Sequence, residues 1–321
     1  MLRRWGTGVA GIVAIALLGG AAVAPKDDPP PDWAFVVFQP SKDPPVKGDV
    51  TVPGSKLHVA AKVLDDPSNE PDWFAEDHPA MPSVVAHGHA PKLWGCAYCH
   101  LPTGIGGPES AVIAGLPAGY IEQQFAEFHA GRRQCPVPKD NPCATSMQKV
   151  SAATTEPELE AAAAYFSGLK YHSRIHVIEA ARVPKTEVEF FARIRAPSGG
   201  DEAIGQRILE VPDDRHLYNA GDWRTTLTAY VPPGSIARGR SLVESGGGAV
   251  PCSVCHGAHL QGADLVPPLA GRSPSYLYRQ LYEIQYGYRH GPAVAQMLPE
   301  VAHLNAKDRI AIVAYLASLK E

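Results

Sequence analysis

The pattern of apolar and polar positions in the last third of the chain predicts helices. Near the end, apolar side chains recur three and four residues apart, at Ile310, Val313, Leu316 and Ala317. Asn305 is a favourable start for this helix. Serines begin two further stretches, 235–244 and 273–286, and the second serine is followed by a proline, which is typical of a helix start. We therefore expect residues 236–321 to form a helical domain.

The pattern changes between residues 172 and 235, where β-branched and aromatic residues gather in short runs between proline and glycine turns. The runs cover residues 174–181, 188–194, 207–211 and 225–231. They predict a small β-rich connector. Residues 25–89 are dense in proline and acidic side chains, which predicts an irregular extension lying over the surface of the folded parts.

The first 24 residues have the layout of a secretory signal peptide. Arg3 and Arg4 precede an apolar stretch over residues 9–18, and small residues follow up to Ala24. We expect export to an oxidising compartment, the periplasm. An uncleaved membrane anchor is the alternative, although the apolar run is shorter than the roughly 20 residues that a bilayer span needs.

An internal repeat relates two parts of the chain. A shift of 156 residues superposes residues 114–133 on 270–289 without a gap. Seven pairs in this window are identical: Ala114/Ala270, Gly115/Gly271, Tyr120/Tyr276, Gln124/Gln280, Glu127/Glu283, Gly131/Gly287 and Arg133/Arg289. Each copy then predicts the structure of the other, so residues 90–171 are expected to form a second helical domain.

The same shift superposes two short strings that carry the strongest chemical signal. Cys96-Ala97-Tyr98-Cys99-His100 and Cys252-Ser253-Val254-Cys255-His256 each have the spacing of a covalent c-type haem attachment site. Two thiols three positions apart reach the two vinyl groups on one edge of a porphyrin. The histidine that follows places an imidazole nitrogen under the iron. We therefore predict two covalently attached haem c groups.

A zinc site or a redox dithiol is the alternative reading of a Cys-x-x-Cys pair. A zinc ribbon needs its second pair about 15 to 20 residues away, whereas these pairs lie 156 residues apart, from Cys96 to Cys252. A dithiol does not explain why a histidine adjoins both copies. Both facts favour haem.

The second axial ligand of each iron is predicted from the repeat. Met147 lies 47 residues after His100, and Met297 lies 41 residues after His256, in matching places of the two copies. Methionine is the ligand that raises the potential of electron-carrying cytochromes. Met81 has no counterpart in the other copy, so we expect it to be packing.

Other side chains near the strings are weaker candidates. Of the other histidines, His89 and His129 flank the first haem site, but none of these others pairs with a histidine at the repeat offset. Cys135 and Cys143 both lie in the loop between Arg133 and Met147, where the first copy is six residues longer, and a disulfide is the simplest prediction for them in an exported protein. The alternative is that one thiolate binds the first iron in place of Met147.

The chain resembles the two-domain, two-haem cytochromes c of the subclass called c-four. The resemblance is carried by both strings together with Gly271-Arg272-Ser273-Pro274-Ser275-Tyr276, Arg279-Gln280-Leu281 and Met297. It implies helical haem domains, electron carriage in the bacterial periplasm, and irons ligated by His100 with Met147 and by His256 with Met297. It also implies that a proline, Pro267 or Pro268, supports the proximal histidine through its carbonyl.

Two departures from the family pattern stand out. The first copy has Ala111 and Val112 where the second has Pro267 and Pro268, so its proximal support is in doubt. The β-rich connector and the acidic extension also lie outside the pattern, which indicates a variant that docks to a specific partner.

The full prediction is a mainly α chain with a tandem pair of cytochrome c-type helical haem domains. We divide it into a signal peptide, an acidic Pro-rich extension, a first haem domain, a β-rich connector and a second haem domain, over residues 1–24, 25–89, 90–171, 172–235 and 236–321. The formal net charge is −4 and no basic block indicates nucleic acid. Membrane attachment is expected only if the first segment is uncleaved.

The expected function is single-electron carriage between a redox protein donor and acceptor, possible partners being a periplasmic dehydrogenase and a terminal oxidase. No enzymatic activity is expected, because electron carriage requires no catalytic acid, base or substrate pocket. Two alternatives are a dihaem redox enzyme, such as a peroxidase or a thiosulfate-oxidising protein, with an open or thiolate-ligated first haem, and a cytochrome subunit of a periplasmic dehydrogenase.

Overall fold

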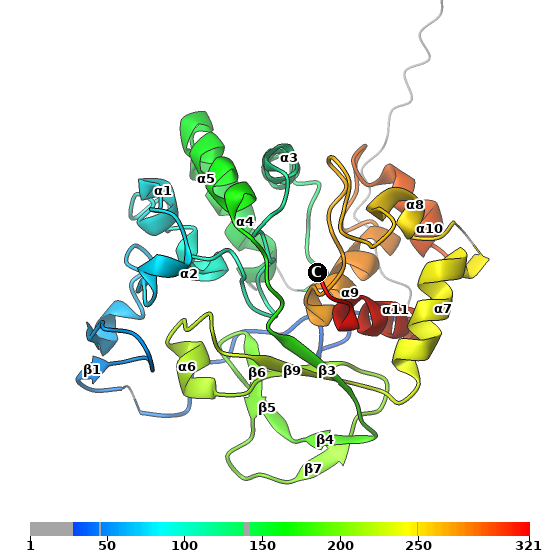
Figure 1. Ribbon diagram of the computed structural model, residues 1–321, viewed down its shortest axis with the longest axis horizontal. Helices are drawn as coiled ribbons and strands as arrows, with labels where there is room; N and C mark the ends of the chain where they lie inside the picture. Colours follow the sequence, from blue (N-terminus) through cyan, green and yellow to red (C-terminus); the bar gives the residue numbers. More distant parts are fainter. Residues whose placement is uncertain (1–27, 45, 138–141, 249) are drawn as a thin grey trace, which may run out of the picture.

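The computed structural model describes residues 28–44, 46–137, 142–248 and 250–321. The predicted signal segment therefore lies outside the described residues. Figure 1 shows two groups of helices above a β-rich layer, with the earlier helices on one side and the later ones on the other. None of the described helices has the length and apolarity to cross a membrane.

The earlier group of helices surrounds the first cysteine string. It consists of α1 (Ser83–Ala86), α2 (Ala97–His100), α3 (Ala118–His129), α4 (Pro142–Ala153) and α5 (Glu156–Gly168). A capping box at Thr155 and Glu158 starts α5, where the side chain of each residue bonds the backbone N–H of the other. Phe166 of α5 is fully buried in an apolar cluster that also contains Ala97 and Ala114. We call this set of residues the first core.

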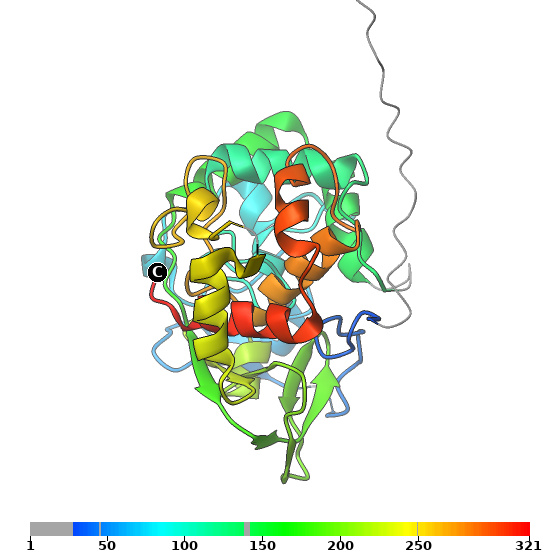
Figure 2. The ribbon, with the colours of Figure 1, turned by 90° about the vertical axis from the view of Figure 1, so that its right-hand side faces the viewer.

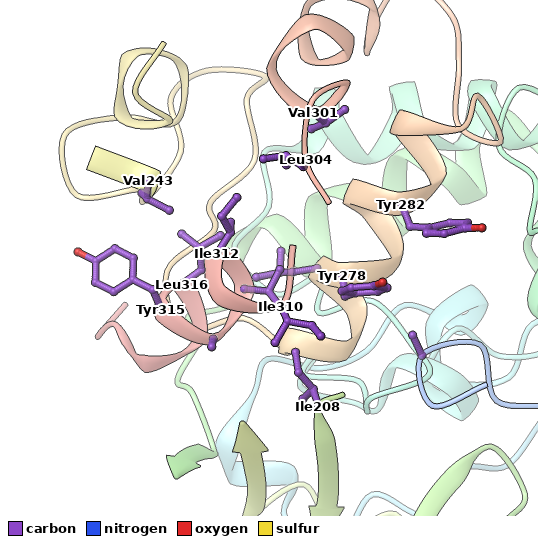
Figure 3. Packing of buried hydrophobic residues seen from close by; sticks show 14 of the residues in the cluster. Ile208, Val243, Tyr278, Tyr282, Val301, Leu304, Ile310, Ile312, Tyr315 and Leu316 are labelled. Atoms are coloured by element: carbon purple, nitrogen blue, oxygen red, sulfur yellow. The ribbon is translucent and has the colours of Figure 1, made fainter. Parts of the chain in front are cut away.

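The later group surrounds the second string. It consists of α7 (Ser235–Ser245), α8 (Ser253–His256), α9 (Pro274–Gln285), α10 (Leu298–Val301) and α11 (Ala306–Ser318). Asn305 caps α11 in a capping box with Asp308, and Ser273 caps α9, as the sequence predicts. Figure 3 shows how side chains of α7, α9, α10 and α11 pack together, among them Val243, Tyr278, Val301 and Ile312. We call this apolar cluster of the later group the second core.

The β-rich layer lies between the two groups in sequence. Its main sheet has the order β3 (Ile175–Glu179), β9 (Leu227–Val231) and β8 (Leu209–Pro212), with β3 parallel and β8 antiparallel to β9. Two antiparallel pairs accompany it: β4 (Arg182–Pro184) with β7 (Asp201–Ala203), and β5 (Thr186–Glu189) with β6 (Ala192–Arg195). Helix α6 (Arg215–Asn219) joins β8 to β9. Figure 2 shows this layer below the helices.

One of the predicted β-rich runs contains a hairpin turn. Residues 188–194 form a single run of β-formers in the sequence, but the chain turns at Phe190, which has a positive φ of 54°, so that β5 and β6 pair with each other. The ring of Phe38 packs on Phe190 and Phe191, with centroids 6.2 and 5.2 Å apart. Contact with the extension therefore supports a turn that a local pattern of β-formers does not reveal.

The extension is also more deeply packed than expected. It contains short strands β1 (Asp49–Val50) and β2 (Val59–Ala60) and two 3₁₀ turns, η1 (Ala61–Val63) and η2 (Ala75–Asp77). Phe35 is buried in the second core, while Trp73 and Phe74 are buried against Trp223. These large apolar side chains need cover, and the proline-rich backbone does not prevent them from finding it.

Candidate haem sites

The second cysteine string forms one helical turn, α8, which begins directly after Cys252. A turn of helix brings residues three apart to the same face, so Cys252 and Cys255 point to one side. Both thiols are free of disulfide bonds. Cys255 is exposed, whereas His256 at the end of the turn is buried. The string therefore presents the Cys255 side of the turn to solvent and keeps the His256 ring, the predicted iron ligand, covered.

The ring of His256 is oriented by a backbone carbonyl. Its Nδ1–H donates to the carbonyl oxygen of Pro267 at 2.8 Å, which leaves Nε2 free to bind a metal. Burial lowers the pKa of His256 and so favours the neutral imidazole, although the bond to Pro267 opposes that shift. Pro267 is one of the two prolines that the family resemblance offered for this role.

An apolar cavity adjoins this string, and the empty space in it together with the open solvent at its mouth is about 1260 Å³. Four predicted haem-binding residues line it together: Cys252, Cys255, His256 and Met297. Apolar side chains from three helices form much of its wall, among them Leu242, Leu277, Leu281, Ile284, Ile312 and Leu316.

The polar atoms on this wall complete the fit to a haem. Arg272 and Arg289 both line the cavity, and the Nε atom of each is buried without a hydrogen-bond partner. A haem carries two carboxylates, which would satisfy such donors. The cavity therefore suits haem c. It offers two thiols for attachment, an imidazole and a thioether for the iron, apolar walls for the porphyrin and two unpartnered guanidinium nitrogens for its carboxylates.

The first string folds in the same way. Cys96 precedes the turn α2, which ends at His100, and the Nδ1–H of His100 donates to the carbonyl oxygen of Ala111 at 2.9 Å. Ala111 is the repeat equivalent of Pro267. The doubt about proximal support in the first copy is therefore unfounded, because the bond uses a backbone carbonyl, which alanine supplies as well as proline does.

The predicted distal ligand of the first iron lies on a different kind of element from that of the second. Met147 is half-buried in α4, which packs against α3, whereas Met297 ends the short 3₁₀ turn η4 (Ala295–Met297). Met81 is half-buried and packs against the first core, as does Cys96. The ligand role of Met147 stays a prediction. Met81 packs against the first core, as we expected.

The structure places the remaining candidates away from the centre of either core. His89 is exposed, with its ring 3.7 Å from the carboxylate of Glu158, and His129 is exposed at the end of α3. Cys135 is half-buried against the second core. The side chain of Cys143 lies outside the described residues, so the predicted disulfide stays a prediction.

A hydrogen-bond network joins the two groups of helices, and we did not predict it from the sequence. Arg133 donates to the amide oxygens of Gln124 (3.2 Å) and Gln280 (2.9 Å), and Arg289 donates to the same two oxygens at 3.0 and 2.9 Å. These four residues are two repeat-equivalent pairs, and all four are buried. The two arginines also form an antiparallel bridge. The identities in the repeat were the signal that could have revealed the network.

Comparison with known proteins identifies the family. The family model Cytochrome c matches residues 236–320. Cytochrome c-554(547) from Halothiobacillus neapolitanus is 30% identical over 95 residues, which are 27% of this chain and 99% of that protein. This chain belongs to the cytochrome c family. The resemblance seen in its sequence is thus confirmed, and so is a cytochrome c fold with many helices and some strands.

Other proteins match a larger share of the chain. The thiosulfate dehydrogenase electron acceptor of Stutzerimonas stutzeri (strain A1501) is 27% identical over 236 residues, which are 72% of this chain and 82% of that protein. Among solved structures, reduced cytochrome c4 from Pseudomonas stutzeri is 20% identical with a TM-score of 0.45, covering 70% of this chain and 93% of that one. Thiosulfate dehydrogenase (TsdBA) from Marichromatium purpuratum is 26% identical with a TM-score of 0.48, over 74% of this chain. This chain spans only 39% of that longer chain.

One expectation is overturned by these comparisons. We expected no enzymatic activity, but a relative that is 27% identical over 72% of this chain is named for its part in the reaction of a thiosulfate dehydrogenase. The expectation was wrong because it took electron carriage, which requires no catalytic acid, base or substrate pocket, as the whole function. A haem iron is itself a reactive centre, so such patterns are not required.

Proposed function

We propose that this cytochrome c carries electrons through two covalently attached haem c groups, each ligated by histidine and methionine, and that a thiosulfate dehydrogenase is its electron donor. The observation that supports the donor most strongly is the match to a thiosulfate dehydrogenase electron acceptor over 82% of that protein. The cavity that gathers Cys252, Cys255, His256 and Met297 supports the cofactor.

At the second site, each residue has a role that its surroundings support. Cys252 and Cys255 hold the porphyrin by thioether bonds, and His256 and Met297 bind the iron, which supplies the reversible one-electron step. The carbonyl of Pro267 fixes the histidine ring. The apolar wall excludes water, which together with the methionine favours the ferrous state and a high potential.

At the first site, Cys96, Cys99, His100 and Met147 take the corresponding roles. Cys99 is exposed, as Cys255 is, so each string presents one edge of its site to solvent. An exposed edge is where a redox partner approaches most closely. Two such edges on one chain allow one partner to deliver an electron and another to remove it.

The division of the chain belongs to this proposal as well. It comprises two haem domains over residues 90–171 and 236–321, a β-rich connector over 172–235, and an extension over 25–89. A signal peptide over 1–24 and a periplasmic location complete it, and the disulfide between Cys135 and Cys143 fits such an oxidising compartment. The acceptor protein, a terminal oxidase for example, belongs to the same compartment.

A second candidate function is oxidation of thiosulfate at the first haem. The differences between the two copies favour the first site for this role. The first copy is six residues longer, and Met147 lies on a full helix rather than at the end of a short turn. A weaker or exchangeable distal ligand there would open the iron to a substrate.

Reduction kinetics of the purified holoprotein separate the two functions. The oxidised protein is mixed with thiosulfate alone, with thiosulfate and a catalytic amount of thiosulfate dehydrogenase, and with ascorbate as a control for intact haem. We expect fast reduction only when the dehydrogenase is present. Reduction by thiosulfate alone at the same rate supports the second candidate, and slow reduction in both thiosulfate arms contradicts the proposed donor.

A further inference from the structure

The extension begins with a segment that packs against the second group of helices. We call residues 28–39 the strap. Ala34 and Phe35 are buried, the ring of Trp33 packs at a tilt against that of Tyr278 with centroids 4.5 Å apart, and Phe35 packs edge-on against Tyr282 at 5.3 Å. The strap is thus attached to the face of α9 that carries these tyrosines.

Beneath the strap lies a buried positive charge. The side chain of Arg309, in α11, is fully inaccessible to solvent. Its guanidinium donates to the carbonyl oxygen of Leu304 at 3.1 Å and to the amide oxygen of Gln285. It also lies 5.4 to 5.7 Å from the centroids of three tyrosine rings, which belong to Tyr278, Tyr282 and Tyr286.

The carboxylate that pairs with this charge comes from the strap. Oδ2 of Asp28 accepts a hydrogen bond from Arg309 at 2.5 Å and another from the hydroxyl of Tyr286 at 2.5 Å. The side chain of Asp28 is 25% exposed, so the anion sits nearer to solvent than the cation does. A residue at the start of the described chain therefore neutralises a charge close to its end.

The pair lies directly behind the wall of the haem cavity. Leu304, whose carbonyl accepts from Arg309, also lines the cavity, and so does Ile312, which is three residues beyond Arg309 on α11. Gln285, the other acceptor, follows Ile284, which lines the cavity from α9. Figure 3 shows Leu304 and Ile312 on one side of α9, while the ring of Tyr282 projects from the other side.

We propose that Asp28 sets the reduction potential of the second haem by neutralising Arg309 behind the cavity wall. A cation in an apolar medium acts on a nearby iron with little screening. Reduction adds one electron to the iron, so an uncompensated guanidinium stabilises the ferrous state and raises the potential. The strap is then a potential-setting element, and the inference rests on the second haem of the proposed function.

The test is a spectroscopic redox titration of the holoprotein with Asp28→Asn. This change removes the charge but keeps an oxygen that accepts from Arg309. We expect a higher potential at one haem and no change at the other. Asp32→Asn is the matched control, because it removes the same charge from an exposed position of the same strap. Equal shifts in the two variants, or a lower potential in Asp28→Asn, overturn the proposal.

A second variant keeps the proposal testable if Asp28→Asn folds poorly. Arg309→Met removes the cation and leaves the carboxylate, so the potential of the same haem should fall, and an unchanged potential overturns the proposal. A haemochrome assay on every sample distinguishes the two levels of failure. A missing second haem defeats the proposed function itself, whereas two haems with unshifted potentials defeat only the role of Asp28.

Discussion

At the scale of single residues, the hydrogen bond that orients each proximal histidine depends on the position of a backbone carbonyl and not on the side chain of the residue that supplies it. His100 and His256 each donate Nδ1–H to the carbonyl eleven residues later, although that residue is alanine in one copy and proline in the other. Both rings are thereby held in the tautomer that presents Nε2 to a metal. The sequence repeat predicts the position of the acceptor, and the backbone supplies it.

Replacement of Met297 by alanine tests the distal ligand of the second iron. The weak far-red sulfur-to-iron band of one haem should disappear, and the potential of that haem should fall, because thioether ligation favours the ferrous state. Optical spectra of the ferric protein and a redox titration measure both effects. The neighbouring exposed residue gives the control, Leu298→Ala, which should leave the band in place. A retained band in Met297→Ala excludes this ligand.

Prediction at this scale rests on residue type and spacing, which determine the chemistry that a site can perform. The spacing of cysteines and histidine, with the repeat, located the residues that the structure brings to one cavity, including Met297 from 41 positions downstream. The roles of Arg309 and Asp28 could not be predicted. They depend on a contact between segments 281 residues apart, and neither residue stands in a recognisable motif.

At the scale of elements, α7 and α11 approach each other closely in the later group of helices. Gly239 of α7 faces the backbone of α11, and a Cβ there would lie 1.9 Å from the carbonyl oxygen of Ala311 and 2.8 Å from the Cβ of Tyr315. Backbone atoms cannot move aside as a flexible side chain does. The absence of a side chain at Gly239 therefore sets the distance between the two helices.

We expect Gly239→Ala to destabilise the protein despite the better helix propensity of alanine. Forcing the helices apart should cost about 1 to 3 kcal/mol in the free energy of unfolding, more than the gain of about 1 kcal/mol from propensity. Urea unfolding of the holoprotein measures the difference. Gly168→Ala is the matched control, because nothing lies within 4 Å of a Cβ at that helical glycine. Equal stability of the two variants contradicts the close packing.

Helices were easier to predict from the sequence than the connector and the extension. Capping residues such as Ser273 and Asn305 act within one turn, so their effect is visible locally. The turn at Phe190 and the burial of Phe35 depend on partners more than a hundred residues away. Local patterns contain no information about such contacts, so they revealed neither the turn nor the burial, and only a β-rich run and a surface extension were expected there.

At the scale of the whole molecule, the repeat explains how the two groups of helices meet. Gln124 and Gln280, with Arg133 and Arg289, occupy equivalent places in the two copies and bond across the interface. Each amide oxygen accepts from both arginines. Two buried guanidinium groups are thus tolerated side by side, because acceptors from both copies share the donors.

Gln280→Met should loosen this interface. The change keeps the length of the side chain but removes an oxygen that two buried arginines share, which should lower the free energy of unfolding by about 3 kcal/mol. Calorimetry of the holoprotein measures the loss. Gln134→Met, at an exposed glutamine near the same interface, should be close to neutral. A neutral Gln280→Met would show that the network does not hold the two copies together.

The central claim is that both cysteine strings carry a haem, and intact-mass analysis of the denatured holoprotein tests it most directly. Thioether-bound haem stays with the chain on denaturation, whereas a haem held only by iron ligands is lost. We predict a mass equal to that of the processed polypeptide plus two haems, and loss of one haem in Cys252→Ala with Cys255→Ala. A mass with one haem or none would contradict the account.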